Sequence, residues 1–361
     1  MNELSAEHVG LRDAVAALLA KRSDSAAVRK AIETSRGYDE GLWSVLCEQI
    51  GVAGLAIPER FGGAGASLFE THLVLLELGR TLTPSPLLGS AVLAGQLLLA
   101  LGDEAACERL LPAIADGTSV ASVCWAAAAG HWDPRSGAVE AAESRLTGEC
   151  HYVLDGDIAD VLLVLARDAD AVAVFEVDPR APGVIRTHTP TMDRTRRLAS
   201  VQFDGAPARK IGTADAVEAL ARVRDIGCVA LSAEQVGAAA RILEMTVEYT
   251  KLRVQFGRPI GSFQALKHRM ADLHVLVEAA RSASFGAVGS VVPAAVAKAY
   301  CSEAFFAVAA EAIQLHGGIA ITWEHDAHLY FKRAHASAQL FGAPGEHLVR
   351  MAAMAGLEQT P

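Results

Sequence analysis

Apolar residues recur every three to four positions through residues 1–115 and again from residue 214 to the end. This period predicts α-helices, because successive turns bring such positions to the same side. Loops rich in glycine and proline interrupt the first region at 56–65 and 82–89. The last region is less interrupted, and we expect long helices over residues 216–252, 263–289, 293–315 and 324–338.

Between these regions the pattern changes to short apolar runs bounded by Gly, Pro or Asp, which is typical of β-strands. The runs are CHYVL (150–154), DVLLVLA (160–166), AVAVFEV (171–177), GVIRTHT (183–189) and ASVQFDG (199–205). Helices, then a small β unit, then a helical bundle predict an α+β fold. We expect an N-terminal helical domain over 1–118, a middle β domain over 119–213 and a C-terminal four-helix bundle over 214–361.

The longest apolar run, residues 87–101, contains Ser90, Gly95 and Gln96. It is shorter than the roughly 20 residues that span a bilayer, so we expect a buried helix and no membrane span. The polar and acidic start of the chain, MNELSAEHVG, does not resemble a secretory signal or a transit peptide. These features predict a cytoplasmic protein.

Composition narrows the class of protein further. Of the 361 residues 52% are hydrophobic but only 6% aromatic, so Ala, Leu and Val must build the core, which favours close-packed helices. The net charge is −10 and basic residues form no run longer than a pair, which argues against nucleic-acid binding.

Cysteines and histidines give no pattern of metal binding. The six cysteines, none in a CxxC spacing, are expected to be reduced and mostly buried: Cys47, Cys107, Cys124, Cys150, Cys228 and Cys301. His325 and His328 lie three residues apart beside acidic residues, but nothing nearby completes a ligand set. We interpret them as a polar helix start and expect no metal.

The segment RVQFGRPIGSFQ at 253–264 joins a cation, two aromatic rings, glycines and two amides between two helical runs. Arg253 offers planar charged donors that suit a pyrophosphate, and Gly257 lets the backbone turn. The mixture is unusual for a buried linker, so our hypothesis is a ligand with anionic and apolar parts. The alternative is a hinge and helix cap that binds nothing.

Four stretches carry a family resemblance. They are GVAGLAIPERFGGAG (51–65), MDRTRRLASVQFDGAP (192–207), RVQFGRPIGSFQALKHRMADL (253–273) and QLHGGIAITWEHDAHLYFKRA (314–334). Their order and spacing over nearly the whole chain resemble the acyl-CoA dehydrogenase family. The resemblance implies a subunit with a helical, a β and a second helical part, FAD as cofactor, and a tetramer built as a dimer of dimers. It also implies α,β-dehydrogenation of an acyl-CoA thioester, with an electron-transfer flavoprotein as acceptor.

By this resemblance the chain grips the ADP half of an FAD whose flavin ring lies mainly in a neighbouring subunit. Two segments would do so, the second because its glycines admit close approach of the backbone. The residues carried over are Arg253, Gln255, Phe256, Ile260, Phe263 and Gln264 in the first segment and Gln314, Gly317 and Gly318 in the second.

The catalytic carboxylate that the family needs is missing at both positions where its members place it. One is the glutamate of a Tyr-Glu-Gly element after the second segment, and counting puts Ala334 there, followed by His335. The other is a Glu-Arg pair on the helix before the first segment, and counting puts it at Gly227 and Cys228. Alanine and glycine cannot move a proton.

Glu234 is the weak candidate for a displaced base. It lies seven residues after Gly227, about 10 Å along the same helix face, whereas proton transfer needs an approach to about 3 Å. Glu244 and Glu248 are interpreted as a solvated or ion-paired helix face, and His335 as an inert histidine, exposed or at the edge of the core.

The flavin-ring side departs from the family as well. Its Trp-Ile-Thr element, in which the threonine bonds the N5 edge of the flavin, is replaced by YVL at 152–154, and Leu154 cannot make that bond. The Thr-Glu-Pro loop over the flavin is replaced by CWAAAAGHWDP at 124–134. We interpret Trp125 and Trp132 there as packing residues.

The residues expected to bind the ADP half of FAD are present, whereas the catalytic base and the flavin-ring contacts are missing. This combination suits a subunit whose partner is a paralogue with a complete site. The chain resembles the non-catalytic subunit of α2β2 acyl-CoA dehydrogenases of actinobacterial steroid side-chain catabolism. Two alternatives stay open: a self-sufficient homotetramer using Glu234, and an acyl-CoA-binding scaffold without flavin. A flavin-dependent oxidase or monooxygenase is a further possibility.

Overall fold

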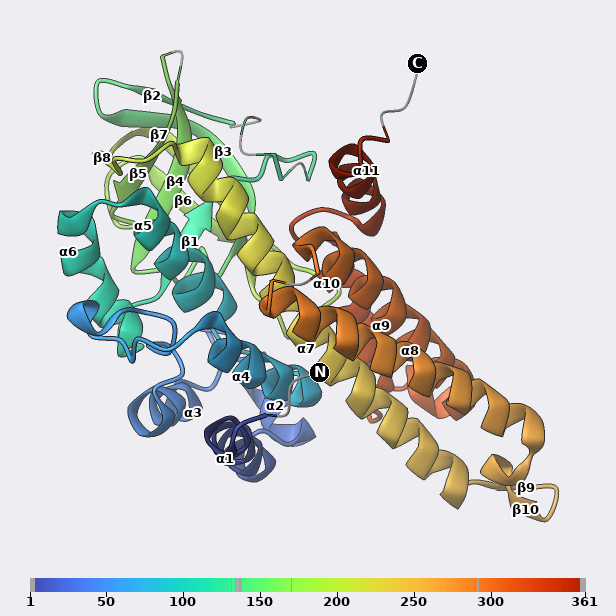
Figure 1. Ribbon diagram of the computed structural model, residues 1–361. Coiled ribbons are helices and arrows are strands. Elements are labelled where there is room, and N and C mark those ends of the chain that lie inside the picture. The colour runs from blue at the N-terminus through green and yellow to red at the C-terminus, as the bar shows by residue number, and fades with distance from the viewer. Residues whose placement is uncertain are drawn as a thin grey trace. The chain divides into compact units, whose positions relative to one another are not determined.

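The computed structural model describes residues 4–130, 132–133, 135, 138–169, 171–290 and 292–357. The chain forms two compact units (Figure 1). The bundle unit comprises Met1–Lys30, His72–Thr83 and Cys228–Pro361, and the sheet unit comprises Ala31–Thr71 and Pro84–Gly227. The α+β class is confirmed. The division into three domains at residues 118 and 213 stays a prediction.

The elements occur in the order that the hydrophobic pattern predicts. The helices are α1 (Ala6–Arg22), α2 (Ser25–Ala31), α3 (Glu40–Val45), η1 (Leu46–Ile50), η2 (Glu59–Phe61), α4 (Leu68–Thr81), η3 (Leu88–Ala94), α5 (Gly95–Leu101), α6 (Glu104–Ala115), α7 (Ala216–Leu252), η4 (Ile260–Ser262), α8 (Gln264–Val288), α9 (Ala294–His316), η5 (Gly317–Ile321), α10 (Ala327–Gln339) and α11 (Pro344–Met354). The strands are β1 (Ala121–Cys124), β2 (Val139–Ala142), β3 (Arg145–Leu154), β4 (Val161–Asp168), β5 (Ala171–Val177), β6 (Val184–His188), β7 (Leu198–Pro207), β8 (Arg209–Ile211), β9 (Val254–Gln255) and β10 (Arg258–Pro259).

The sheet unit is built on one mixed sheet of strand order β6-β7-β3-β2-β4-β5-β8, with β1 also paired to β4. Most neighbours are antiparallel, but β1 and β2 both run parallel to β4. Alternation along β3 and β7 sends Leu146, Cys150, Val201 and Phe203 into a buried apolar cluster. This cluster is what the short apolar runs of the sequence supply.

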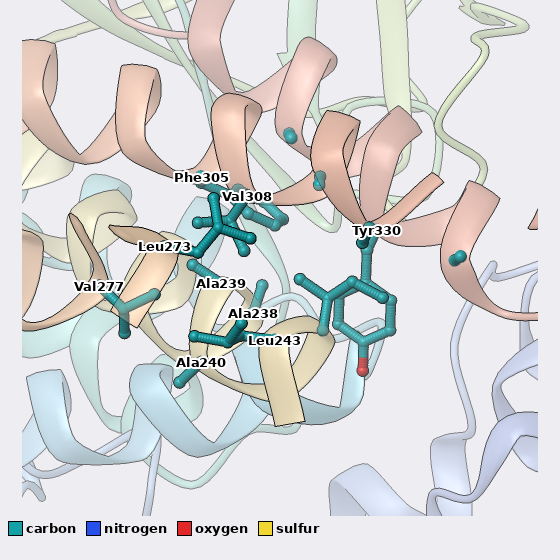
Figure 2. Packing of buried hydrophobic residues seen from close by; sticks show 14 of the residues in the cluster. Ala238, Ala239, Ala240, Leu243, Leu273, Val277, Phe305, Val308 and Tyr330 are labelled. Atoms are coloured by element: carbon teal, nitrogen blue, oxygen red, sulfur yellow. The ribbon is translucent and has the colours of Figure 1, made fainter. Parts of the chain in front are cut away.

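The long helices of the bundle unit pack around small side chains. Alanines in the middle of α7 let α8, α9 and α10 approach closely, and larger side chains fill the space between them. The residues drawn together in Figure 2 are Ala238, Ala239, Ala240 and Leu243 of α7, Leu273 and Val277 of α8, Phe305 and Val308 of α9, and Tyr330 of α10.

Two glycines bring α4 and α7 into backbone contact. A Cβ atom added to Gly237 would lie 2.0 Å from the carbonyl oxygen of Leu76, and one added to Gly79 would lie 2.2 Å from the carbonyl oxygen of Glu234. Real Cβ atoms do not come so close to backbone oxygen, so only glycine permits this seam. The packing leaves no width for another group between the two helices at these positions.

Two described helices, Ala216–Leu252 and Ala294–Ile321, are long and apolar enough to cross a membrane by length and composition alone. The core helix of a folded domain passes the same test. The most apolar window is 83% buried in the first helix but only 44% buried in the second. The first is therefore a core helix, whereas the second keeps apolar surface, including Tyr300 and Phe306, open.

All six cysteines are buried free thiols, as expected from their spacing. The apolar run at 87–101 is confirmed as buried helix, formed by η3 and α5. Burial raises the pKa of the Cys150 and Cys301 thiols to about 12, which leaves both protonated and unreactive at neutral pH.

Candidate functional site: a cofactor grip without a base

The first predicted segment forms a projecting hairpin at one end of the α7–α8 pair (Figure 1). Strands β9 and β10 are joined by Phe256 and Gly257, whose φ angles of 54° and 74° are those of a type I′ turn. Phe256 is 91% exposed. A bulky residue held at positive φ with its ring in solvent is unusual, and points to a role in contact with something outside this chain.

The remaining hairpin residues are placed by local contacts. The Arg258 guanidinium lies 4.0 Å from the centre of the Phe263 ring, which in turn meets the Phe256 ring edge-on at 6.1 Å. The backbone N–H of Ile260 donates to the carbonyl of Arg253 at 2.8 Å, closing the loop. Gln264 begins α8 and lies 3.4 Å from His268.

The polar groups of this hairpin are available to a ligand. Arg253, Gln255 and Gln264 are exposed. Among the described residues the Arg253 guanidinium forms no ion pair. An exposed arginine, amides and an aromatic ring form a donor set that fits a nucleotide diphosphate.

The second segment lies where α9 ends. Gly317 has φ 66° and ψ −148°, a conformation open essentially only to glycine. A Cβ atom on Gly317 or Gly318 would meet nothing within 4 Å, so their backbone faces open space. Gln314 is exposed one turn earlier. The last turn of α7 contacts this end of α9, because the Tyr249 ring stacks on the His316 ring at 4.5 Å.

The two segments therefore lie at one end of the bundle unit, and their donor set fits the ADP half of FAD. Arg253 would neutralise phosphate charge, Gln255 and Gln314 would add hydrogen bonds, and the open glycine backbone would admit close approach. The sequence predicted each of these residues. Their role in binding stays a prediction.

The positions counted as the catalytic base carry no usable group. Ala334 is fully buried in α10, and His335 is exposed beside the Phe306 ring at 6.2 Å. Cys228 is fully buried in α7, next to Gly227. The placement of His335 agrees with the inert histidine that we expected.

The structure favours a different match for the family's Tyr-Glu-Gly element. Helix α10 ends at Gln339 and is followed by Leu340, Phe341 and Gly342. These three residues end in a glycine, as the Tyr-Glu-Gly element does, whereas His335 stands at the glycine position in the match to Ala334. Phe341 has φ 63° and is 1% exposed, and Gly342 has φ 109°. By this match a buried phenylalanine, rather than Ala334, stands in place of the glutamate. The position of the base, at Ala334 by counting or at Phe341 by this match, stays a prediction; Gly342 is the signal in the sequence that favours Phe341.

Glu234 is paired rather than free. Its Oε2 lies 3.3 Å from Nη1 of Arg333, and the two side chains are 10% and 6% exposed. The pair borders a narrow crevice between α4, α7, α9 and α10 that has no room for even a water-sized molecule, whereas the smallest ligand pockets hold roughly 300 Å³. A carboxylate tied to an arginine on the next helix fits a structural role better than that of a base.

The flavin-ring positions are filled by the chain's own side chains. Tyr152 sits at a bulge in β3 with φ 54°, and its hydroxyl donates to the carbonyl of Ala128 at 3.1 Å. Leu154 is buried, and its Cβ would lie 3.1 Å from a side chain at Gly89 of η3. It therefore offers no hydrogen bond outward.

Trp125 and Trp132 pack against each other edge-on at 5.7 Å, and Trp132 also approaches the Tyr152 ring at 6.5 Å. Both tryptophans are buried within the sheet unit. Residues 131 and 134 of the CWAAAAGHWDP loop lie outside the described residues.

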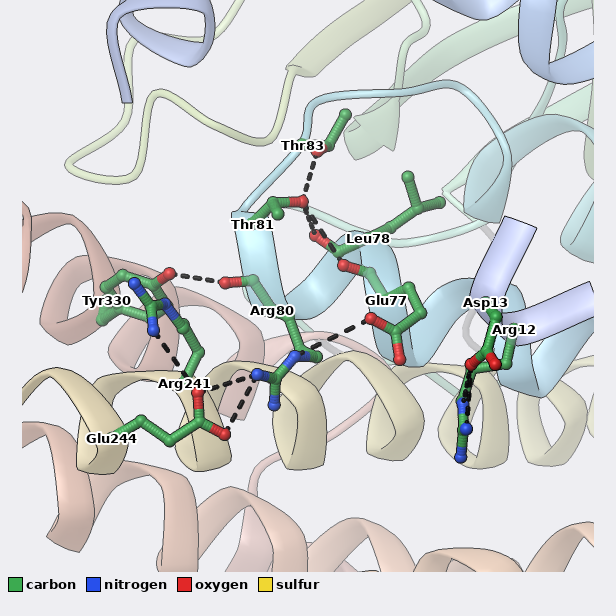
Figure 3. A network of polar contacts seen from close by, with 10 residues as sticks. All are labelled: Arg12, Asp13, Glu77, Leu78, Arg80, Thr81, Thr83, Arg241, Glu244 and Tyr330. Carbon is green, nitrogen blue, oxygen red and sulfur yellow. Dashed lines mark hydrogen bonds and ion pairs between the residues drawn. The ribbon is translucent and has the colours of Figure 1, made fainter. Parts of the chain in front are cut away.

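An ionic network lies beside α4 (Figure 3); the sequence suggested an ion-paired face at Glu244 but not its partner Arg80. Arg80 donates to both carboxylate oxygens of Glu244 at 2.7 and 3.0 Å. The Oε2 atom of Glu77 lies 3.7 Å from Nε of Arg80. Burial raises the pKa of Glu77. Burial also acts to raise the pKa of Glu244, but the Arg80 and Arg241 guanidinium groups together hold it below its ordinary value. The Tyr330 hydroxyl donates to the Arg80 carbonyl. The network lines a cleft of about 450 Å³ and ties α4 to α7 and α10.

Asp155, directly after Leu154, is a buried acid at the end of β3. Burial raises the pKa of its carboxyl to about 7, with the Arg196 guanidinium acting against this rise and the Asp157 carboxylate adding to it. Unfolding exposes the group and returns its pKa to about 3.9. Between these values the unfolded chain has released a proton that the folded chain keeps, so stability falls as pH rises from about 4 to 7.

Asp155→Asn is therefore expected to raise the free energy of unfolding by about 2 kcal/mol at pH 8, and by little at pH 4. Urea unfolding at both pH values measures this. As a matched control, Asp157→Asn should lower stability, because Asp157 accepts from Arg197 at 2.5 and 2.9 Å. Equal stability of Asp155→Asn and the wild type at pH 8 would contradict the assignment.

Comparison with known proteins defines the class. Residues 5–118 match the model of the acyl-CoA dehydrogenase N-terminal domain, and residues 212–355 match that of the acyl-CoA dehydrogenase C-terminal domain. The chain belongs to the acyl-CoA dehydrogenase family. Membership in this family supports oxidoreductase activity with FAD as the cofactor.

Particular relatives are similar over nearly the whole chain. Acyl-CoA dehydrogenase IpdE2 of Mycolicibacterium smegmatis is 46% identical over 352 residues, covering 97% of this chain and 99% of that protein. The ChsE4-ChsE5 complex of Mycobacterium tuberculosis contains a chain with TM-score 0.89 and 28% identity, covering 99% of both chains. A Tcur3481-Tcur3483 steroid ACAD variant has a chain with TM-score 0.85 and 29% identity, covering 97% and 98%.

Proposed function

We propose that this chain is the base-lacking subunit of a heterotetrameric, FAD-dependent acyl-CoA dehydrogenase that desaturates an acyl-CoA thioester. It would supply the ADP-binding half of an FAD site whose catalytic half belongs to a paralogous subunit. One observation carries the proposal: the ADP-binding donors are exposed, whereas the base and ring positions hold Phe341 and Leu154, both buried.

When bound, FAD supplies a hydride acceptor for the substrate β-carbon. The residues of this chain would bind and orient it. Arg253 places a delocalised cation beside the diphosphate, and Gln255 and Gln314 donate without adding charge. Phe256, at the hairpin tip, would cover an apolar part of the bound FAD, and the Gly317 backbone would let the chain approach the cofactor closely.

An apolar face on the bundle unit supports assembly with a partner. Helix α9 is mainly apolar, yet Tyr300 and Phe306 on it are 37% and 41% exposed. Large apolar side chains left exposed in this way are typical of an interface. The similarity to a chain of the ChsE4-ChsE5 complex makes a paralogous partner in an α2β2 arrangement the proposal we favour.

The substrate class, the electron acceptor and the location are proposed by analogy with relatives. The Tcur3481-Tcur3483 relative is a steroid ACAD, so a steroid-derived acyl-CoA is the substrate class to test first. An electron-transfer flavoprotein would accept the electrons, as the family resemblance implies. We place the complex in the cytoplasm.

Arg253→Ala tests the proposal. The change removes charge-assisted hydrogen bonds to phosphate, so the Kd for FAD of the co-expressed complex should rise about 10- to 100-fold. Flavin fluorescence titration of the apo complex measures this, alongside FAD per subunit and acyl-CoA-dependent dye reduction. Arg258→Ala is the matched control, since Arg258 lies in the same hairpin but stacks on Phe263.

Two outcomes would overturn the proposal. One is an Arg253→Ala complex that binds FAD as tightly as the wild type. The other is a lone chain with a flavin in every subunit and full turnover, which would favour the self-sufficient homotetramer. A lone chain and a complex that both lack flavin would instead favour the acyl-CoA-binding scaffold. Formation of peroxide or an oxygenated product would indicate an oxidase or a monooxygenase.

A further inference from the structure

Three aromatic rings form a column at the end of the bundle unit that carries both cofactor segments. The Tyr249 ring, in the last turn of α7, stacks on the His316 ring at 4.5 Å with an interplanar angle of 28°. The His316 ring meets the His325 ring at 4.6 Å and 56°. The column thus joins α7, the end of α9 and the loop before α10.

The column is joined to both segments through the chain, because Tyr249 comes shortly before the first segment and His316 lies within the second. Tyr249 accepts the backbone N–H of Arg253 on its carbonyl at 2.9 Å, so its position sets the start of the hairpin. His316 directly precedes Gly317 and follows Gln314 by two residues. Tilting or removing the middle ring would therefore change the separation between Arg253 and the glycine backbone.

The hydrogen bonds of the two imidazoles fix complementary neutral forms. Nδ1 of His316 donates to the carbonyl of Ala312 at 2.8 Å, which leaves its Nε2 unprotonated. Nδ1 of His325 accepts the N–H of Ala327 at 3.1 Å, which places its proton on Nε2. Burial lowers the pKa of both rings. Both stay uncharged at neutral pH, which lets the two tilted rings lie close together without charge repulsion.

We propose that the Tyr249–His316–His325 column is a positioning device that fixes the spacing between the 253–264 hairpin and the 314–318 segment. It thereby sets the affinity for a diphosphate-containing cofactor. The inference rests on the proposed function, because it assumes that the two segments bind one ligand. His316 and His325 touch no part of the ligand in this scheme; they act through Arg253, Gln314 and Gly317.

Acid should loosen the column. The charged and titratable groups that face the two histidines are Tyr249 from α7, Arg29 from α2 and Asp326 beside His325. Burial lowers the pKa of both histidines, so each becomes protonated only at a pH below the ordinary histidine pKa of 6.5. Two cations 4.6 Å apart would then repel each other. FAD affinity should accordingly fall as the pH drops below 6.5.

The test uses the co-expressed complex and three variants. His316→Ala removes the middle ring, His316→Phe keeps a ring but cannot titrate, and His328→Ala removes a nearby imidazole that stacks on Trp323 instead. We measure the Kd for FAD by flavin fluorescence at pH 7.5 and 5.5, and thermal midpoints in parallel.

We expect His316→Ala to raise the Kd at least tenfold at pH 7.5, and His316→Phe and His328→Ala to change it less than twofold. His316→Phe should also remove most of the loss of affinity between pH 7.5 and 5.5. An unchanged Kd in His316→Ala, or an equal acid response in His316→Phe and the wild type, would overturn the inference. If Arg253→Ala leaves the Kd for FAD unchanged, the proposed function is wrong. If Arg253→Ala raises the Kd but His316→Ala leaves it unchanged, the proposed function stands and only the inference about the ring column is wrong.

Discussion

Replacing Gly237 by alanine should lower the free energy of unfolding by about 3 kcal/mol, the upper end of the usual cost of overpacking. The new Cβ would lie 2.0 Å from the Leu76 carbonyl oxygen, so α4 and α7 must separate and lose contacts along their seam. Alanine favours helix over glycine by about 1 kcal/mol, but this gain is smaller than the loss. Urea unfolding followed by circular dichroism measures the change.

The chain supplies a matched control in Gly10, which lies inside α1 where an added Cβ would meet nothing within 4 Å. Gly10→Ala should therefore stabilise the chain by about 0.5–1 kcal/mol through helix propensity alone. If Gly237→Ala is as stable as Gly10→Ala, the close seam between the helices does not exist.

Replacing Arg333 by leucine should cost about 3–5 kcal/mol, because it leaves the buried Glu234 carboxylate without its cation. Replacing both partners by leucine should cost much less, since an apolar pair of similar volume avoids the desolvation of two charges. Chemical unfolding of the two single variants and the double variant closes a mutant cycle whose coupling energy reports the pair.

A further variant decides whether Glu234 acts as a base. Glu234→Gln in the co-expressed complex is expected to leave acyl-CoA-dependent dye reduction within about twofold of the wild type, because a paired structural acid moves no proton. A loss of about 10²-fold or more, the size of a general-base effect, would return Glu234 to the position of a displaced base.

The helices were predictable because their apolar period continues over many turns. The expected run 216–252 is α7, and 263–289, 293–315 and 324–338 differ from α8, α9 and α10 by three residues or fewer at either end. Strands β1, β2 and β8 were missed, because three or four residues are too few to show a period. They are strands because β4, β3 and β5 offer them hydrogen bonds.

The cofactor segments were predictable because Arg, Gln, Phe and Gly at fixed spacing carry chemistry in the sequence itself. The tertiary features were not. Gly79 and Gly237 are 158 positions apart in the sequence, and nothing local says that each faces the other's helix. The pKa of Asp155 depends on burial, and the match of Phe341 to the base depends on where α10 ends.

The exposed face of α9 has a consequence for how the protein must be made. A chain released alone from the ribosome would carry Tyr300 and Phe306 into the crowded cell uncovered, where they would favour self-association and capture by chaperones or proteases. If a paralogue covers this face, a surplus of either subunit is unstable. Balanced synthesis of the two, with assembly soon after folding, would then set how much active complex accumulates.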